Sequence, residues 1–282
     1  MSDTDDAQHD FWNKGPGERW AEFQPDLDLM QQGVADRLMA LAAPRPGMRV
    51  LDIGCGAGAT TLAAARAVAP QGQVTGADIS EVLLARARDR AAAEGVADAA
   101  FLRADAQTAQ MGGPFDLALS RFGVMFFADP QAAFANIRRQ LARAGRLVFA
   151  AWSGSARNPW FHVPRAAAEA RLGRGAPGDP EAPGPMALQD PARIAALLSA
   201  AGYARPQIRT EEVVLHHPGG LDAVMRTIPF IGPVGGLMRE KAGDAADLEA
   251  ILDSVAITFS QWDRPDGLHL PAEINLVTAA GA

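Results

Sequence analysis

The segment from Val50 to Ala59, VLDIGCGAGA, constrains the fold more than any other part of the chain. An apolar, strand-like run ends in three glycines at alternate positions, Gly54, Gly56 and Gly58, and a helical pattern follows at once. Glycine permits a tight turn and the close approach of a ligand because it has no Cβ atom. The N–H groups of the first helical turn are then free to meet that ligand. A glycine loop can also be no more than a tight strand-to-helix turn, so other residues must decide between the two interpretations.

Strand-like and helix-like segments alternate regularly around this loop. The expected strands are residues 49–53, 73–79, 99–104, 116–120 and 145–152, and the expected helices are 60–69, 81–94 and 130–141. The strands are nearly continuous apolar runs, which is typical of a parallel sheet covered on both faces. The alternation predicts an α/β fold with a Rossmann-like, doubly wound sheet.

Segments outside this alternation divide the chain further. Residues 1–46 form an N-terminal arm with one expected helix at 29–42, and residues 47–152 form the core. Residues 153–189 are an irregular insertion, and 216–271 are a second insertion with helical pieces. Residues 190–215 and 272–282 complete the core with a helix and two strands. Ligands of open α/β sheets bind beyond the carboxyl ends of the strands, so the arm and the insertions are predicted to form a helical lid there.

Three aspartates narrow the choice of ligand. Asp78 ends the second strand and can accept hydrogen bonds from both ribose hydroxyls of a nucleoside. It could instead cap the next helix, but Ser80 is the better candidate for that position. A dinucleotide and S-adenosylmethionine both fit these residues. The carboxylate of Asp52 would repel a pyrophosphate and suits the ammonium group of a methionine moiety, and Asp105 can accept from an adenine amino group.

Five motifs in order carry a family resemblance: VLDIGCGAGATT, GADIS, RADAQ, FDLALSRFGVMFFADP and LARAGRLVFAAW. Together they resemble class I S-adenosylmethionine-dependent methyltransferases over about 110 residues between 47 and 152. The arm segment FWNKGPGERW is similar to the start of small-molecule methyltransferases of the type that includes quinone-ring C-methyltransferases. One departure is Ala144, where the family commonly has proline.

The resemblance implies a seven-stranded sheet whose last strand is antiparallel. It also implies S-adenosyl-L-methionine as cofactor, with S-adenosyl-L-homocysteine as product. The residues that it places at the cofactor are Asp52, Gly54, Gly56, Gly58, Asp78, Ile79, Asp105, Ala106, Ser120 and Arg121.

Methyl transfer from a sulfonium depends mainly on holding the acceptor and the methyl group in line, which is worth up to ~7–11 kcal/mol. A base is required only if the acceptor keeps its proton at neutral pH, and the candidates are His162 and His216. His9 and His269 are expected in surface segments. The aromatic residues expected at the acceptor are Trp20, Phe122, Trp160 and Phe161, while Trp12, Trp152, Phe126 and Phe127 are further candidates for an apolar pocket. Aromatic residues are more often simply core.

Charge and cysteine content exclude several classes. The formal net charge is −7, which argues against nucleic-acid binding. The chain has one cysteine and no HExxH spacing, so we expect neither disulfides nor a metal site. No secretory signal and no apolar run of membrane length is apparent, which favours the cytoplasm. The sequence predicts a methyltransferase for a small, apolar or aromatic acceptor. An NAD(P)-dependent oxidoreductase and a non-catalytic S-adenosylmethionine-binding regulator remain as alternatives, and the oligomeric state stays open.

Overall fold

The computed structural model describes residues 3–281, with the side chains described from residue 8 onward. Before the core, the chain forms four helices, α1 (Asp3–Asn13), α2 (Gly15–Glu22), α3 (Gln24–Met30) and α4 (Gln32–Ala42). The core elements that follow are β1 (Arg49–Ile53), α5 (Ala59–Val68), β2 (Gln73–Asp78), α6 (Glu81–Ala93), β3 (Ala99–Arg103), β4 (Phe115–Arg121), η1 (Gly123–Phe126), α7 (Pro130–Arg139) and β5 (Leu141–Trp152). The remaining elements are η2 (Ser155–Arg157), α8 (Pro159–Leu172), α9 (Pro191–Ala200), β6 (Ala204–His217), α10 (Gly220–Met225), α11 (Val234–Glu240), α12 (Ala245–Phe259), η3 (Ser260–Trp262), β7 (Asp263–Arg264) and β8 (Gly267–Ala280).

The sheet has the strand order β3-β2-β1-β4-β5-β8-β6, and the two-residue strand β7 pairs with β8 beside this path. Strands β1 to β5 pair in parallel, whereas β8 lies antiparallel between β5 and β6. The predicted fold class is therefore confirmed, with β7 as an addition.

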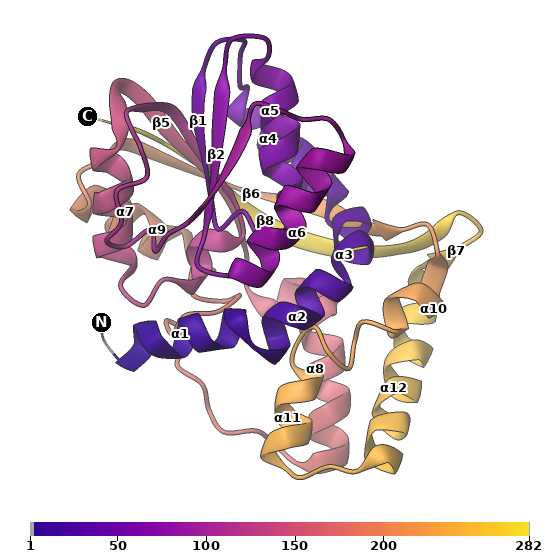
Figure 1. The fold of residues 1–282 in the computed structure, drawn as a ribbon. Helices are drawn as coiled ribbons and strands as arrows, with labels where there is room; N and C mark the ends of the chain where they lie inside the picture. Colours follow the sequence, from indigo (N-terminus) through magenta and orange to yellow (C-terminus); the bar gives the residue numbers. More distant parts are fainter. Residues whose placement is uncertain (1–2, 282) are drawn as a thin grey trace.

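Helices cover both faces of the sheet (Figure 1). Alternation along each strand sends neighbouring side chains to opposite faces. Val50, Leu117 and Val148 accordingly pack in one hydrophobic cluster with Leu38 of α4 and residues of α5. Leu51 and Phe149 belong to the larger cluster on the opposite face, which also contains side chains of α7, α8 and α9.

The structure corrects three expectations about the segments outside the core. The N-terminal arm is helical almost throughout, and α4 begins at Gln32 rather than at residue 29. The supposedly irregular segment after β5 contains the 14-residue helix α8. Strand β8 begins at Gly267, so the second insertion ends several residues before the expected boundary at 271.

The insertions form a helical layer at one end of the sheet. Helices α8, α11 and α12 lie together there, and α1 and α2 cross between this layer and the sheet (Figure 1). Within residues 3–281, no helix combines the length and the apolar character needed to cross a membrane.

Candidate functional site

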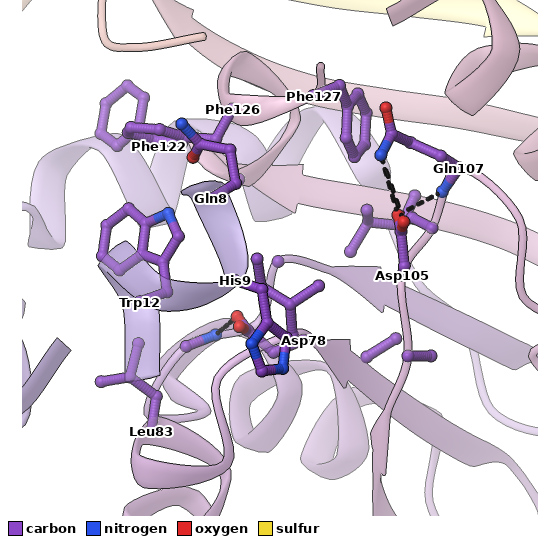
Figure 2. Close-up of a pocket in the computed structure, with 18 of the residues that line it drawn as sticks. Gln8, His9, Trp12, Asp78, Leu83, Asp105, Gln107, Phe122, Phe126 and Phe127 are labelled. Atoms are coloured by element: carbon purple, nitrogen blue, oxygen red, sulfur yellow. Dashed lines mark hydrogen bonds between the residues drawn. The ribbon is translucent and has the colours of Figure 1, made fainter. Parts of the chain in front are cut away.

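A cavity of about 210 Å³ opens at the carboxyl ends of β1, β2, β3 and β4. Its walls come from the loops that follow these strands and from helix α1, which closes one side (Figure 2). The predicted cofactor residues that line this first cavity are Gly54, Gly56, Asp78, Ile79, Asp105, Ala106 and Arg121. Asp52, Gly58 and Ser120 are not among its lining residues.

The three glycines of the loop after β1 have different roles. Each has a positive φ. A Cβ atom on Gly54 would lie 2.6 Å from the Cα atom of Gly123, so this position allows two backbones to approach. A Cβ atom on Gly56 would meet no described atom within 4 Å, so the backbone at Gly56 faces open space in the cavity. Gly58 begins α5, and a Cβ atom there would crowd Ala87 and Phe101, so its role is packing.

Asp78 connects the glycine loop to the start of α6. Its Oδ2 atom accepts a hydrogen bond from the N–H of Gly56 at 2.8 Å, and its Oδ1 atom accepts one from the N–H of Ser80 at 2.9 Å. Burial raises the pKa of this carboxyl group, and the two N–H donors oppose the rise. Each carboxylate oxygen has a further lone pair. Asp78 can therefore hold the loop and still accept hydrogen bonds from a diol in the cavity.

Asp105 lies on the opposite wall, after β3. Its carboxylate accepts from the backbone N–H of Gln107 at 2.8 Å and from the Gln107 side-chain amide (Figure 2). The neighbouring Ala106 is buried, and its carbonyl oxygen accepts from Asn136. These bonds hold the carboxylate of Asp105 and the apolar Ala106 in place on this wall. Asp78 lies on the other wall, so a nucleoside could place its base at Asp105 and its ribose at Asp78.

Asp52 lies behind the glycine loop rather than in the cavity wall. It is fully buried, and its Oδ2 atom accepts hydrogen bonds from the hydroxyls of Thr60 and Thr61, both at 2.6 Å. Its Oδ1 atom has no hydrogen-bond partner among the described residues. Burial raises the pKa of Asp52 to about 6, against the opposing effects of the two hydroxyls and of Arg121. Asp52 therefore holds the first turn of α5 beneath the loop.

Ser120 is also buried, and its hydroxyl donates to the carbonyl oxygen of Ile53 at 2.7 Å. The next residue, Arg121, reaches the cavity and pairs with Asp28 of α3 at 3.2 Å. Asp28 also pairs with Arg90 at 3.0 Å, and Arg90 donates to the carbonyl oxygen of Ala57 in the glycine loop. This partly buried network ties the N-terminal arm to the loop.

The end of α1 is fastened directly to the loop after Asp78. The side chain of Asn13 donates to the carbonyl oxygen of Ile79 at 3.0 Å and accepts from the N–H of Glu81 at 2.9 Å. The hydroxyl of Ser80 donates to the carbonyl oxygen of Trp12 at 2.6 Å. Nothing in the local sequence around Asn13 indicates a partner 66 positions away, so this residue could not be predicted from the sequence.

The position of His9 differs from the one that the sequence predicts. The sequence predicts a surface segment for His9, but the residue lines the first cavity from α1 (Figure 2). It also contacts Arg103 at the end of β3. Gln8, one residue earlier, lines the same cavity, and its Oε1 atom is buried without a hydrogen-bond partner among the described residues. Helix α1 thus brings polar groups as well as Trp12 to this wall.

A second, larger cavity of about 570 Å³ adjoins the first. Four aromatic side chains line both cavities, and we call them the aromatic collar: Trp12, Trp20, Phe122 and Phe126. Trp12 meets Phe126 and Trp20 edge to face, with ring centroids 5.0 and 5.7 Å apart. Beyond the collar, Trp152, Trp160, Phe161 and Met186 give the second cavity a largely apolar wall.

Phe122 occupies an unusual position in this collar. Its φ of 68° lies in the left-handed region, which bulky residues rarely adopt. Its N–H donates to the carbonyl oxygen of Ala150 at 3.0 Å, and its ring stacks on Trp152 at 4.1 Å. These contacts hold a strained residue where the two cavities meet, as is common at functional sites.

The two candidate bases lie in different places. His162 lines the second cavity from the first turn of α8, as do Trp160 and Phe161. Glu169 and Arg165 follow on the same helix and line the same cavity, paired with each other at 2.8 Å. His216 lines neither cavity, and its ring faces His269 across the β6–β8 pair.

Comparisons with known proteins agree with this geometry. Residues 44–173 match a family model described as a methyltransferase domain. The chain is 36% identical to nocamycin O-methyltransferase from Saccharothrix syringae, over 61% of this chain and 60% of that protein. It is 31% identical to the ubiquinone/menaquinone biosynthesis C-methyltransferase UbiE from Burkholderia vietnamiensis, over 51% of this chain and 53% of that protein. The matches thus span only half to three fifths of these relatives.

The fold itself is similar to solved structures over nearly the whole chain. Phosphoethanolamine N-methyltransferase 2 from Haemonchus contortus, in complex with S-adenosyl-L-methionine, superposes with a TM-score of 0.58. The match covers 97% of this chain and 59% of that one, at 17% identity. At this identity the likeness concerns the fold.

Proposed function

Because this chain belongs to the class I S-adenosylmethionine-dependent methyltransferases, we propose that it moves a methyl group from S-adenosylmethionine to a small, apolar or aromatic acceptor. The observation that carries the proposal is the pair of cavities joined by the aromatic collar. The first has polar groups suited to a nucleoside, and the second is lined mainly by aromatic and other apolar side chains. The collar is the place where a donor in one cavity and an acceptor in the other would meet.

The residues of the first cavity fit the cofactor by their chemistry. Asp78 would accept from the ribose hydroxyls, Asp105 would accept from the adenine amino group, and the bare backbone at Gly56 would let the cofactor lie close to the loop. Arg121, already held by Asp28, would offer a cation to the carboxylate of the methionine moiety. When bound, S-adenosylmethionine supplies a methyl group that is already activated by its sulfonium.

The chain's own contribution to the reaction is then mainly positioning. The rings of the collar would exclude water and hold a flat acceptor, and such alignment can lower the barrier by up to ~7–11 kcal/mol. His162 is the candidate base for an acceptor that carries a hydroxyl proton. An acceptor that is already deprotonated would leave His162 without a part in catalysis. The relatives include both an O-methyltransferase and a C-methyltransferase.

The size and lining of the second cavity support the acceptor class. Its volume lies within the ~300–1,000 Å³ common for small-molecule sites. A small-molecule acceptor, a location in the cytoplasm and the absence of a nucleic-acid partner remain predictions. The prediction that no nucleic acid is bound rests on the net charge of −7, and the single cysteine is compatible with a reducing compartment such as the cytoplasm.

Calorimetric titration of the purified full chain with S-adenosylhomocysteine tests the cofactor, with NADH and NADPH as comparisons. We expect micromolar or tighter binding, about −8 kcal/mol, for S-adenosylhomocysteine alone. Binding of a nicotinamide cofactor instead would overturn the proposal.

A turnover assay with S-adenosylmethionine and a panel of phenols, hydroxyquinones and amines tests the reaction by the S-adenosylhomocysteine released. The same assay on His162→Ala should lose roughly 100-fold in rate only with hydroxyl acceptors. Cofactor binding without turnover on any acceptor would favour a non-catalytic regulator.

A further inference from the structure

The two ends of the second insertion meet at a pair of histidines. The chain leaves the sheet after β6, forms α10, α11 and α12, and returns through β7 into β8. His216 of β6 lies directly opposite His269 of β8 in the antiparallel register. Side chains of directly opposed residues project on the same face of a sheet. The two imidazole rings accordingly lie with their centroids 4.5 Å apart.

A carboxylate completes this cluster. The Nε2 atom of His269 lies 3.0 Å from Oδ1 of Asp266, and the Nε2 atom of His216 lies 3.1 Å from the carbonyl oxygen of the same aspartate. One ligand atom from each of the three side chains lies within 4.8 Å of the other two. Three ligands around a zinc ion at 2.0–2.2 Å would be roughly 3.4 Å apart, so small side-chain rotations would bring them to that separation.

We propose that His216, Asp266 and His269 bind a divalent transition-metal ion of the zinc type. Two imidazole nitrogens and one carboxylate oxygen are ligands that suit zinc or nickel, whereas magnesium and calcium prefer an all-oxygen set. Three protein ligands leave at least one coordination position for water. This proposal departs from the sequence-based expectation of no metal site, which considered only spacings along the chain.

Gly267, the first residue of β8 after the turn that contains Asp266, keeps this cluster open. Gly267 has a φ of 128°, and a Cβ atom there would lie 2.3 Å from the carbonyl oxygen of His217 and 3.0 Å from Nε2 of His216. A side chain at this position would therefore displace either the backbone or the ligand nitrogen. Glycine preserves both the turn and the space beside His216.

The position of the cluster indicates a structural role. None of its three residues lines either cavity. The ion would instead join both ends of the insertion, and the same insertion contributes Ile231, Gly232 and Pro233 to the wall of the second cavity. Bound metal would thus restrain the base of the lid that borders the acceptor cavity.

Titration of the untagged full chain with zinc chloride, with magnesium chloride as a comparison, tests the site. We expect one equivalent of zinc to bind with a Kd on the order of micromolar and no binding of magnesium. His216→Gln and His269→Gln should each weaken zinc binding at least ~10-fold. His162→Gln is the matched control, because it removes a histidine of the second cavity that is not part of the cluster, and its zinc affinity should equal that of the parent.

Thermal unfolding separates loss of the site from loss of the fold. At 100 times the parent's Kd, zinc should raise the Tm of the parent by about 5 °C and that of His269→Gln by no more than about half as much. Asp266 has a side chain that is 73% exposed, so Asp266→Asn should keep the metal-free Tm of the parent and still bind zinc more weakly. Absence of zinc binding by the parent, or equal binding by all the variants, would overturn the proposal.

Discussion

Asp52 and Asp78 lie at or near the ends of neighbouring strands, yet their surroundings give them different roles. The carboxylate of Asp78 lines the first cavity and accepts from two backbone N–H groups, so it is a group that a ligand can reach. The carboxylate of Asp52 is fully buried beneath the glycine loop and accepts from two threonine hydroxyls. Sequence position alone suggested that both contact the cofactor. Only the packing of Thr60 and Thr61 over Asp52 distinguishes them.

Substitution of Asp78 tests its role toward the ligand. Asp78→Ala removes an ionised acceptor and frees the N–H of Gly56, and each charged hydrogen bond is worth ~1.5–3 kcal/mol. We expect the affinity for S-adenosylhomocysteine to fall roughly 100-fold, with cooperative unfolding retained. Asp89→Ala, on the exposed side of α6, is the control and should bind as the parent does. Wild-type affinity in Asp78→Ala would contradict the ribose assignment.

The titration of Asp52 should make the free energy of unfolding depend on pH. Burial raises its pKa in the folded state to about 6, above the ordinary value of 3.8. Between these values the folded state binds more protons than the unfolded state, so the contribution of Asp52 to stability is greatest below pH 4 and is lost as the pH rises through about 6. The asparagine side chain in Asp52→Asn cannot ionise, so this variant does not lose that contribution to stability as the pH rises.

Denaturant unfolding of both proteins from pH 4 to pH 7 measures the effect. The free energy of unfolding of Asp52→Asn, minus that of the parent, should increase by about 2.4 kcal/mol over this range. Taking the difference cancels the other titrating groups. A difference that does not change with pH would show that the carboxyl group titrates normally in the folded state.

At the scale of elements, caps and alternation made most of the core predictable. Ser80 is the cap that the sequence predicts for α6, and its side chain accepts a hydrogen bond from the first turn of that helix. Asp129 and Asp190 cap α7 and α9 in the same way. The bounds of β1 agree with the sequence, and those of β2 differ by one residue. These features are local, so a short stretch of sequence contains the information for them.

The lid and the arm were less predictable because tertiary contacts determine them. Helices α1 and α2 have little local signal, and long-range contacts such as those of Asn13 with Ile79 and Glu81 hold the end of α1 in place. The pairing of His216 with Asp266, 50 positions later, likewise depends on a hairpin that closes around three helices. Spacing rules for metal ligands therefore could not bring His216 and Asp266 together, although His216 was a candidate base.

The contact between α1 and α2 gives a prediction at this scale. A Cβ atom on Gly17 of α2 would lie 2.0 Å from the carbonyl oxygen of Trp12, the same oxygen that accepts from Ser80. Gly17→Ala should push α1 away from the loop after Asp78 and weaken the binding of S-adenosylhomocysteine about 10-fold, the loss of roughly one hydrogen bond. Gly15→Ala is the matched control, since a Cβ atom there meets nothing within 4 Å. Equal affinities of the two variants would show that the position of α1 does not affect the binding of S-adenosylhomocysteine.

At the scale of the whole molecule, different parts of the chain form the two cavities. The core of parallel strands supplies most of the first cavity, and the segments that were hardest to predict, the arm and the insertions, supply much of the second. The family match covers residues 44–173, whereas the last part of the second cavity wall comes from residues beyond it. Under the proposed function, part of the acceptor site would therefore lie outside the family match.

The place of β8 in the sheet also dictates an order of events during synthesis. Among the described strands, β6 lies at the edge of the sheet and pairs with β8 alone, and β8 also separates it from β5. β6 is translated before α10, α11 and α12, whereas its partner follows them. At ~5–20 residues per second, the ribosome needs several seconds to add this stretch. During that interval the open edge of β5 and the whole of β6 are unpaired, so the nascent chain exposes two strand edges to chaperones and to aggregation before the sheet can close.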